Sequence, residues 1–275
     1  MHNRLRVIAL IAVFSCLACC VGLAQGKGDF YASAKEEYFL GELLATYSTD
    51  FGFSSEGRRY NVKKATSLVD GSIVKAGEIF SFNAVTGERT KENGYKESPI
   101  IERGKYIIGV GGGVCQVSTT LYNAVLRAGL RIERVSPHSL PVGYVPPSMD
   151  AMVSSATDFR FFNDTPFPIT IKGSTNGNTL TFQIYGFRTI TDGEEVKYRS
   201  CVTKVLSASY EELPDLGGEL AEGEEYKTIK RAKDGLVSEC YKEVYYQGNL
   251  VSNTLVRRDV YKAENGVRLV KAEDK

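Results

Sequence analysis

The chain has 275 residues, of which 43% are hydrophobic and 24% charged, a composition typical of a globular protein and not of a disordered or multi-span membrane protein. It carries 34 Lys and Arg against 33 Asp and Glu, a formal net charge of +1, without a basic block, so nucleic acid is not an expected partner. The histidines are His2 and His138. A zinc site built from several histidines is therefore excluded in the folded body, and we expect no metal or organic cofactor.

The first residues have the pattern of an export signal. Residues 1–6 (MHNRLR) carry two arginines, and the apolar run that follows has no charge up to Ala24. Small residues near Ala24 favour cleavage there, which makes residues 1–24 a signal peptide. An uncleaved N-terminal anchor and lipid attachment at Cys19 or Cys20 are the alternatives. Each interpretation places the protein outside the cytoplasm, without other membrane contact.

Three segments follow the signal: a lead-in over residues 25–39, a mixed domain over 40–187 and a β-rich unit over 188–275. In the mixed domain the pattern predicts helices over 61–69, capped by Asn61, and from Val114 to a stop at Gly129. It predicts strands over 73–82 and 131–135, and a hairpin formed by 167–173 and 179–186. The fold class is α+β, with helices and antiparallel sheet in the domain that would carry the chemistry.

The segment after Phe187 reads as β-structure. The run 211–225 (EELPDLGGELAEGEE) has seven acids and no base, which is typical of a solvated loop. The strands expected around it are 196–206, 226–232, 236–246 and 250–262.

Cleavage of the signal would leave Cys115, Cys201 and Cys240 in the mature chain. An odd number in an exported protein leaves one thiol unpaired or paired with another chain. We expect a disulfide between Cys201 and Cys240, which would close a loop of about 40 residues and stabilise the protein by roughly 4 kcal/mol. Cys115 is then the odd thiol.

Cys115 lies in the first turn of a predicted helix, directly after three glycines (GGGVCQVSTTLYNAV). The positive end of a helix stabilises a thiolate and lowers its pKa. Gly112 and Gly113 would let a substrate carbonyl approach the backbone, and the N–H groups near Cys115 and Gln116 are candidates for an oxyanion hole. The alternatives are a buried structural cysteine and a phosphate-binding loop, although no lysine follows at the position such a loop needs.

His138 follows 23 residues after Cys115, in a loop after the predicted strand 131–135. A helix followed by a returning strand can bring the two side chains together, which would pair a thiol with the imidazole of the mature chain.

The stretch from about Phe80 to Gly186 resembles the VanW family. The resemblance is carried by FSFNAVTGERT, GGGVCQVSTTLYNAV, ERVSPHS, Tyr144, Asp150 and FFNDTPFPITI. The sequence departs from the family pattern at Ser148, where glycine is usual, and at Met152, where threonine is usual. The resemblance implies a cell-envelope protein, and some members look like L,D-transpeptidases that use the motif cysteine as nucleophile.

Carried onto this sequence, the resemblance makes Cys115 the nucleophile and His138 its base. Asp150 and Ser139 are candidates for the group that orients the imidazole, and spacing does not decide between them.

Gln116, Ser118 and Tyr144 join Gly112 and Gly113 as candidate substrate-pocket residues. The expected function is an exported cysteine L,D-transpeptidase that acts on peptidoglycan stem peptides through a thioester. A cysteine peptidoglycan hydrolase and a non-enzymatic peptidoglycan-binding module are the alternatives.

Overall fold

The computed structural model describes residues 41–102, 105–187 and 193–271. The expected signal peptide, residues 1–24, and the expected lead-in, residues 25–39, lie outside the described residues. Within the described ranges, no helix combines the length and the apolar character needed to cross a membrane.

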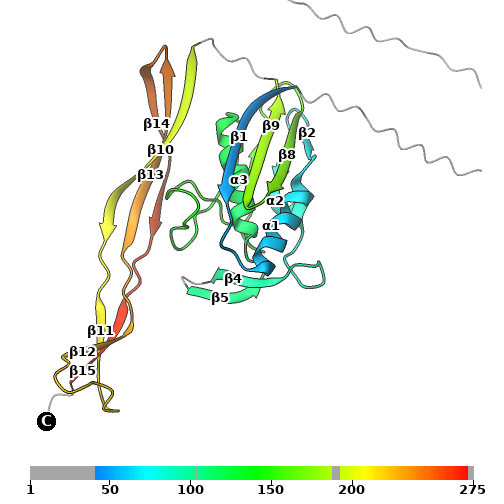
Figure 1. Ribbon diagram of the computed structural model, residues 1–275. Helices are drawn as coiled ribbons and strands as arrows, with labels where there is room; N and C mark the ends of the chain where they lie inside the picture. Colours follow the sequence, from blue (N-terminus) through cyan, green and yellow to red (C-terminus); the bar gives the residue numbers. More distant parts are fainter. Residues whose placement is uncertain (1–40, 103–104, 188–192, 272–275) are drawn as a thin grey trace, which may run out of the picture. The chain divides into compact units, whose positions relative to one another are not determined.

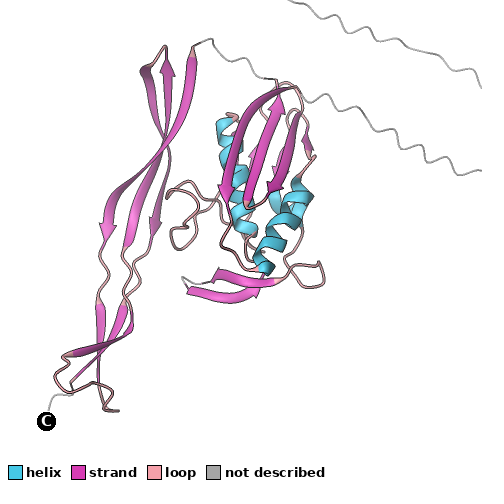
Figure 2. Ribbon diagram, viewed as in Figure 1, coloured by secondary structure: helices cyan, strands magenta, loops and turns pink. Residues whose placement is uncertain are grey.

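Residues 41–187 form an antiparallel sheet with helices packed against it (Figures 1 and 2). Across the sheet, the strands are β1 (Glu42–Asp50), β9 (Thr179–Gly186), β8 (Ile169–Asn176) and β2 (Ile73–Val74). The helices of this segment are α1 (Glu56–Val69), α2 (Phe82–Thr86) and α3 (Val114–Arg127). Because α3 contacts β1 and β9 while α1 contacts β8 and α3, helices and sheet enclose one core.

Periodic burial explains this core. In β9, Leu180, Phe182 and Ile184 are fully buried and alternate with more exposed residues, as expected for a strand with one face on a core. In α3, Val117 and Leu121 are fully buried and recur at helical spacing. The hairpin predicted from the sequence is confirmed by β8 and β9, and the predicted helix beginning at Val114 is confirmed by α3.

Two predicted boundaries are wrong. Helix α1 begins at Glu56 and is capped by Ser55, whose hydroxyl accepts the N–H of Arg58 at 3.4 Å. Asn61 is instead fully buried inside the helix. Its amide group donates to the carbonyls of Lys96 and Gly112 at 2.8 and 3.0 Å, so it ties α1 to the glycine run.

The single strand predicted over 73–82 is divided. β2 ends at Val74, and β3 (Ile79–Ser81) begins after a turn that contains Gly77 at φ 77. A glycine tolerates this left-handed backbone, which the alternating pattern alone does not reveal. The two short sheets of this segment are β3–β7–β6, with β7 at Arg160–Phe162 and β6 at Arg131–Arg134, and the unpredicted hairpin of β4 (Glu97–Glu102) and β5 (Lys105–Val110).

The segment after residue 193 consists of strands, as predicted. The first sheet has the order β10 (Glu194–Leu206), β13 (Gly235–Tyr246) and β14 (Asn249–Tyr261). The second has the order β11 (Tyr210–Pro214), β15 (Gly266–Val270) and β12 (Tyr226–Lys230). The start of the acidic run is therefore not a loop, because β11 pairs in parallel with β15. Helices and mainly antiparallel sheets together make the chain α+β.

The expected disulfide between Cys201 and Cys240 is not present, and both thiols are free. The strand register explains this result. Cys240 lies opposite Ser200, and Cys201 lies opposite Glu239, so the two cysteine side chains point to opposite faces of the sheet. Cys240 is buried, and burial raises the pKa of its thiol to about 11. Buried and protonated, Cys240 is an unreactive thiol.

Candidate functional site

Close backbone packing explains the glycine run before Cys115. Gly113 has φ 101, a conformation that favours glycine. A Cβ added to Gly113 would lie 2.9 Å from Cγ of Arg58, and one added to Gly112 would lie 2.2 Å from Oγ of Ser98. These glycines thus let the chain turn tightly into α3 and set the position of Cys115 in its first turn.

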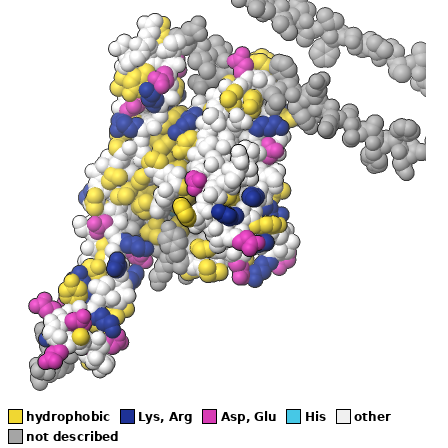
Figure 3. Space-filling view, viewed as in Figure 1, with side chains coloured by type: hydrophobic (Ala, Val, Ile, Leu, Met, Phe, Trp, Pro, Cys, Tyr) yellow, Lys and Arg dark blue, Asp and Glu magenta, His cyan; other side chains and the backbone are white. Residues whose placement is uncertain are grey.

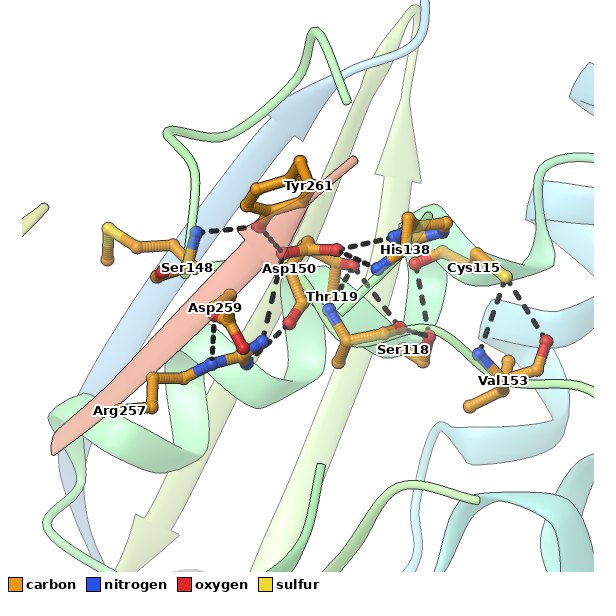
Figure 4. Close-up of polar contacts among 12 residues, drawn as sticks. Cys115, Ser118, Thr119, His138, Ser148, Asp150, Val153, Arg257, Asp259 and Tyr261 are labelled. Atoms are coloured by element: carbon orange, nitrogen blue, oxygen red, sulfur yellow. Dashed lines mark hydrogen bonds and ion pairs between the residues drawn. The ribbon is translucent and has the colours of Figure 1, made fainter. Parts of the chain in front are cut away.

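His138, Asp150 and Cys115 lie together in the fold (Figure 4). Nδ1 of His138 lies 2.6 Å from Oδ2 of Asp150, and the same oxygen accepts the backbone N–H of His138 at 2.7 Å. The imidazole and the thiol of Cys115 are close enough for each to shift the pKa of the other. Because Asp150 occupies Nδ1, the other ring nitrogen is the one left for the thiol. Of the two candidates for orienting the ring, the structure brings Asp150 to it, whereas Ser139 is exposed.

Cys115, His138 and Asp150 shift one another's pKa values toward the charged forms. Burial of the Cys115 thiol favours its neutral form, but the hydrogen bond and charge of His138 outweigh burial and lower its pKa. Burial also opposes the charge on His138, but hydrogen bonds to Asp150 and Cys115 raise its pKa to about 9. The carboxyl of Asp150 has a lowered pKa, because the contact with His138 outweighs its burial. The site therefore favours a thiolate beside an imidazolium.

Alkylation of Cys115 should report this ion pair. We expect the rate of reaction with iodoacetamide to reach half its maximum at a pH below the ordinary thiol value of 9.0. In His138→Ala the midpoint should move upward, because burial of the thiol remains and its charged partner is lost. Mass spectrometry of the Cys115 peptide separates this thiol from Cys201 and Cys240. An identical midpoint in the variant would contradict the assignment.

Residues of β14 hold Asp150 from the side opposite His138 (Figure 4). The hydroxyl of Tyr261 donates to Oδ1 of Asp150 at 2.7 Å and accepts the N–H of Ser148 at 2.8 Å. Arg257 donates to the backbone carbonyl of Asp150 at 2.8 Å. Sequence patterns did not single out Tyr261 or Arg257, since 111 residues separate Tyr261 from Asp150.

Ser148 shows the consequence of one departure from the family pattern. Its φ is 61, in the left-handed region that favours glycine. A serine here costs about 1–2 kcal/mol of backbone strain. Its side chain is hydrogen bonded to the hydroxyl of Ser238 in β13, which offsets part of that cost.

A cavity of about 670 Å³ opens beside Cys115 and His138. Four of the predicted substrate-pocket residues line it: Gly112, Gly113, Gln116 and Tyr144. Burial raises the pKa of Tyr144 well above its ordinary value, so its hydroxyl stays protonated.

Two predicted roles change. Ser118 does not line the cavity; it is fully buried and donates to the carbonyl of Ala151 at 2.6 Å, so it fixes the segment next to Asp150. Gln116 is 1% exposed, and its side-chain amide donates to the Asp50 carbonyl at 2.8 Å, which ties α3 to β1. The backbone N–H of Gln116 donates to the Gly113 carbonyl at 3.0 Å. That N–H is therefore not the oxyanion donor, and the N–H of Cys115 remains the candidate.

Within the described ranges, His, Cys, Asp and Glu side chains do not gather in a group able to hold a metal ion. On the face drawn in Figure 3, Lys and Arg side chains are interspersed with Asp and Glu.

Comparisons with known proteins identify a protein family that matches part of the chain. Residues 57–185 match the family model described as "VanW like protein". The protein named "Uncharacterized protein YoaR" of Bacillus subtilis (strain 168) is 45% identical over 145 residues, which are 52% of this chain and 48% of that protein. "Vancomycin B-type resistance protein VanW" of Enterococcus faecalis (strain ATCC 700802 / V583) is 32% identical over 152 residues, which are 50% of this chain and 55% of that protein.

The chain spans about half the length of the curated relatives it matches. Two solved structures also match: "Crystal structure of HP0197-G5" and "IgA1 Protease G5 domain structure", with TM-scores of 0.20 and 0.21 and identities of 19% and 17%. They cover 29% and 30% of this chain and 97% and 94% of their own chains. The family model and the relatives show that residues 57–185 form a domain of the VanW family.

Proposed function

We propose that this protein is an exported cell-envelope enzyme, a cysteine L,D-transpeptidase that acts on peptidoglycan stem peptides. We further propose that residues 40–187 are its VanW-like domain, residues 188–275 its β-rich C-terminal domain and residues 1–24 its signal peptide. The observation that carries the activity is the Cys115–His138–Asp150 arrangement beside a cavity of about 670 Å³. The relative named as a vancomycin resistance protein supports the cell-envelope setting.

In the first half-reaction the Cys115 thiolate attacks the carbonyl carbon of the scissile amide. A C–S bond forms, and the negative charge on the carbonyl oxygen is stabilised by the N–H of Cys115 and the hydroxyl of Tyr144. His138, held protonated by Asp150, gives its proton to the leaving nitrogen. The C–N bond then breaks, a terminal D-amino acid leaves, and the acyl group remains on Cys115 as a thioester.

In the second half-reaction an amine of a neighbouring stem attacks the thioester. Neutral His138 takes the proton of the attacking nitrogen, the C–S bond breaks, and the thiolate beside an imidazolium returns. One amide bond is broken and one is formed without oxidation or reduction. Asp150 keeps Nδ1 of the ring occupied in both steps, so the other nitrogen always faces the reacting atoms.

The test is incubation of the purified mature protein with disaccharide tetrapeptide, analysed by mass spectrometry of both protein and muropeptides. A transpeptidase gives an acyl adduct on Cys115, free D-amino acid and a cross-linked dimer. Tripeptide in place of dimer would identify the hydrolase. If the protein binds the muropeptide but forms neither an adduct nor a product, both the transpeptidase and the hydrolase are rejected in favour of the binding module.

A further inference from the structure

Arg89 lies in the wall between two cavities. It lines the cavity of about 670 Å³ that contains Cys115, and it also lines a second cavity of about 390 Å³. Glu88 and Ser155 share this wall. The second cavity is further lined by Arg134, Arg160 and Asp158, among others. A ligand that reacts at Cys115 therefore has an arginine and an adjoining polar cavity within the same site.

The side chain of Arg89 is held in place from its base to its guanidinium. A Cβ added to Gly111 would lie 2.7 Å from Cβ of Arg89, so the absence of a side chain at Gly111 gives room to the arginine. Nη2 of Arg89 donates to Oδ1 of Asn83 at 2.6 Å. The amide group of Asn83 is itself fixed by donation to the carbonyls of Ser154 and Thr157 at 2.9 and 3.1 Å.

The charge of Arg89 is not neutralised by a direct ion pair among the described residues. Its fixed partner, Asn83, is a neutral amide, and burial lowers the pKa of the Arg89 guanidinium by more than the nearby charges of Cys115 and Asp158 raise it. The nearby carboxylate of Asp158 is bound by Arg160 at 2.6 Å and by the hydroxyl of Ser81 at 2.7 Å. A half-buried, pre-oriented cation whose fixed partner is uncharged favours an anion in the cavity.

The linings of the two cavities contain two acidic residues, Glu88 and Asp158. Glu88 is exposed and lines both cavities, and Asp158 is engaged by Arg160. Arg134, whose guanidinium donates to the Ala156 carbonyl at a long 3.4 Å, adds a further positive charge to the second cavity. The lining of the second cavity thus holds three arginines against two carboxylates, an excess of positive charge.

We propose that Arg89 is a specificity-determining residue that binds the free carboxylate of the amino acid released from the donor peptide. The proposal rests on the proposed transpeptidase function and adds to it the feature of the substrate that is recognised. In a peptide cleaved at its last amide bond, a single carbon separates the scissile nitrogen from the terminal carboxylate. With the scissile carbonyl at Cys115, that carboxylate lies toward the shared wall, where the guanidinium can donate two parallel hydrogen bonds.

The test compares binding of a stem tetrapeptide with that of its C-terminal carboxamide, using protein with Cys115→Ala so that no chemistry intervenes. We expect the free acid to bind about 10- to 100-fold more tightly than the amide, the range of a charge-assisted hydrogen bond. In Cys115→Ala with Arg89→Gln this preference should disappear, with the acid weakened to the level of the amide. Arg89→Lys should restore part of it.

Arg131→Gln is the matched control. It removes one positive charge, and Arg131 is ion paired with Glu133 at 2.6 Å and lines neither cavity. The control should keep the full preference for the acid. Circular dichroism confirms that each variant is folded.

Equal weakening of acid and amide by Arg89→Gln would overturn the proposal. The proposal would also be overturned if Arg89→Gln kept the preference for the acid and, in protein that retains Cys115, changed only the alkylation midpoint of that thiol. Arg89 would then stabilise the thiolate and not the substrate carboxylate. If the protein prefers the acid through Arg89 but forms neither an acyl adduct nor a product, carboxylate recognition by Arg89 stands and the transpeptidase activity is rejected.

Discussion

Replacement of Cys115 by alanine should abolish the acyl adduct and lower the rate of cross-link formation by roughly 10⁵- to 10⁶-fold, the loss seen when a covalent nucleophile is removed. Folding should persist, because the side chain is small and half-buried. The lost contacts include those with the carbonyl and the N–H of Val153 at 3.3 and 3.5 Å, and we expect a stability cost of about 1 kcal/mol. Intact-mass spectrometry, muropeptide analysis and denaturant unfolding measure the three quantities.

Cys201→Ala is the control for this experiment. Cys201 is another partly exposed free thiol, and it lies in β10 away from the lining of the cavity. Its removal should leave both the adduct and the cross-linking rate unchanged. Cross-linking that survives in the Cys115 variant, or is lost in the Cys201 variant, would place the nucleophile elsewhere.

Local patterns in the sequence predict the parts of this fold that depend on neighbouring residues. The period of apolar residues after Val114 gives α3, and the alternation on both sides of Asn176 and Gly177 gives the β8–β9 hairpin. Hydrophobic periodicity specifies a buried face whatever the rest of the chain does. Caps are harder to locate, because Ser55 and Asn61 are both good capping residues and tertiary contacts decide between them.

Local sequence patterns do not predict the roles of the polar residues in the site. Gln116 and Ser118 have the same polarity as substrate-binding residues, yet both are buried and hold α3 against its neighbours. The choice of Asp150 over Ser139 depends on where a loop returns, which spacing does not contain. The support that Tyr261 gives to Asp150 comes from a strand at the other end of the described chain, and no local signal marks it.

The contact between Tyr261 and Asp150 makes the β-rich segment part of the site. Cys240 of β13 packs with Val145 and Met149, and Ser200 of β10 donates to the carbonyl of Pro147. The loop that carries Ser148 and Asp150 is therefore fixed by strands of the C-terminal segment. Loss of the C-terminal strands would therefore also remove the hydrogen bond from Tyr261 to the carboxylate of Asp150.

Replacement of Asp150 by asparagine should lower the cross-linking rate by roughly 10³- to 10⁴-fold, the effect of removing the carboxylate that orients a catalytic histidine. The amide keeps the shape of the side chain and loses its charge, so the pKa of His138 should fall from about 9. The thiol pKa of Cys115 should rise in turn, because its charged partner is lost. The alkylation midpoint of Cys115 and the cross-linking rate, measured on the same protein, report both effects.

Tyr261→Phe is the graded comparison, since it removes one hydroxyl and leaves the contact between Asp150 and His138 in place. It should lower the rate by only about 10-fold and destabilise the protein by about 1–3 kcal/mol, the cost of leaving a buried carboxylate oxygen and the Ser148 N–H without their partner. A loss equal to that of Asp150→Asn would mean that β14, and not the charge of Asp150, orients the imidazole.

The stability of Asp150→Asn relative to the native protein should also depend on pH. His138 has a raised pKa, so its stabilising contribution is complete below the ordinary value of 6.5 and is lost as the pH rises through about 9. Asp150 has a lowered pKa, so its contribution is present above the ordinary value of 3.8 and is lost as the pH falls through the lowered value. The difference in unfolding free energy between native protein and variant should therefore be greatest at about pH 5–6 and shrink toward pH 10. Urea unfolding at these pH values measures it, and a difference that stays constant would show that the two side chains do not form an ion pair in the native protein.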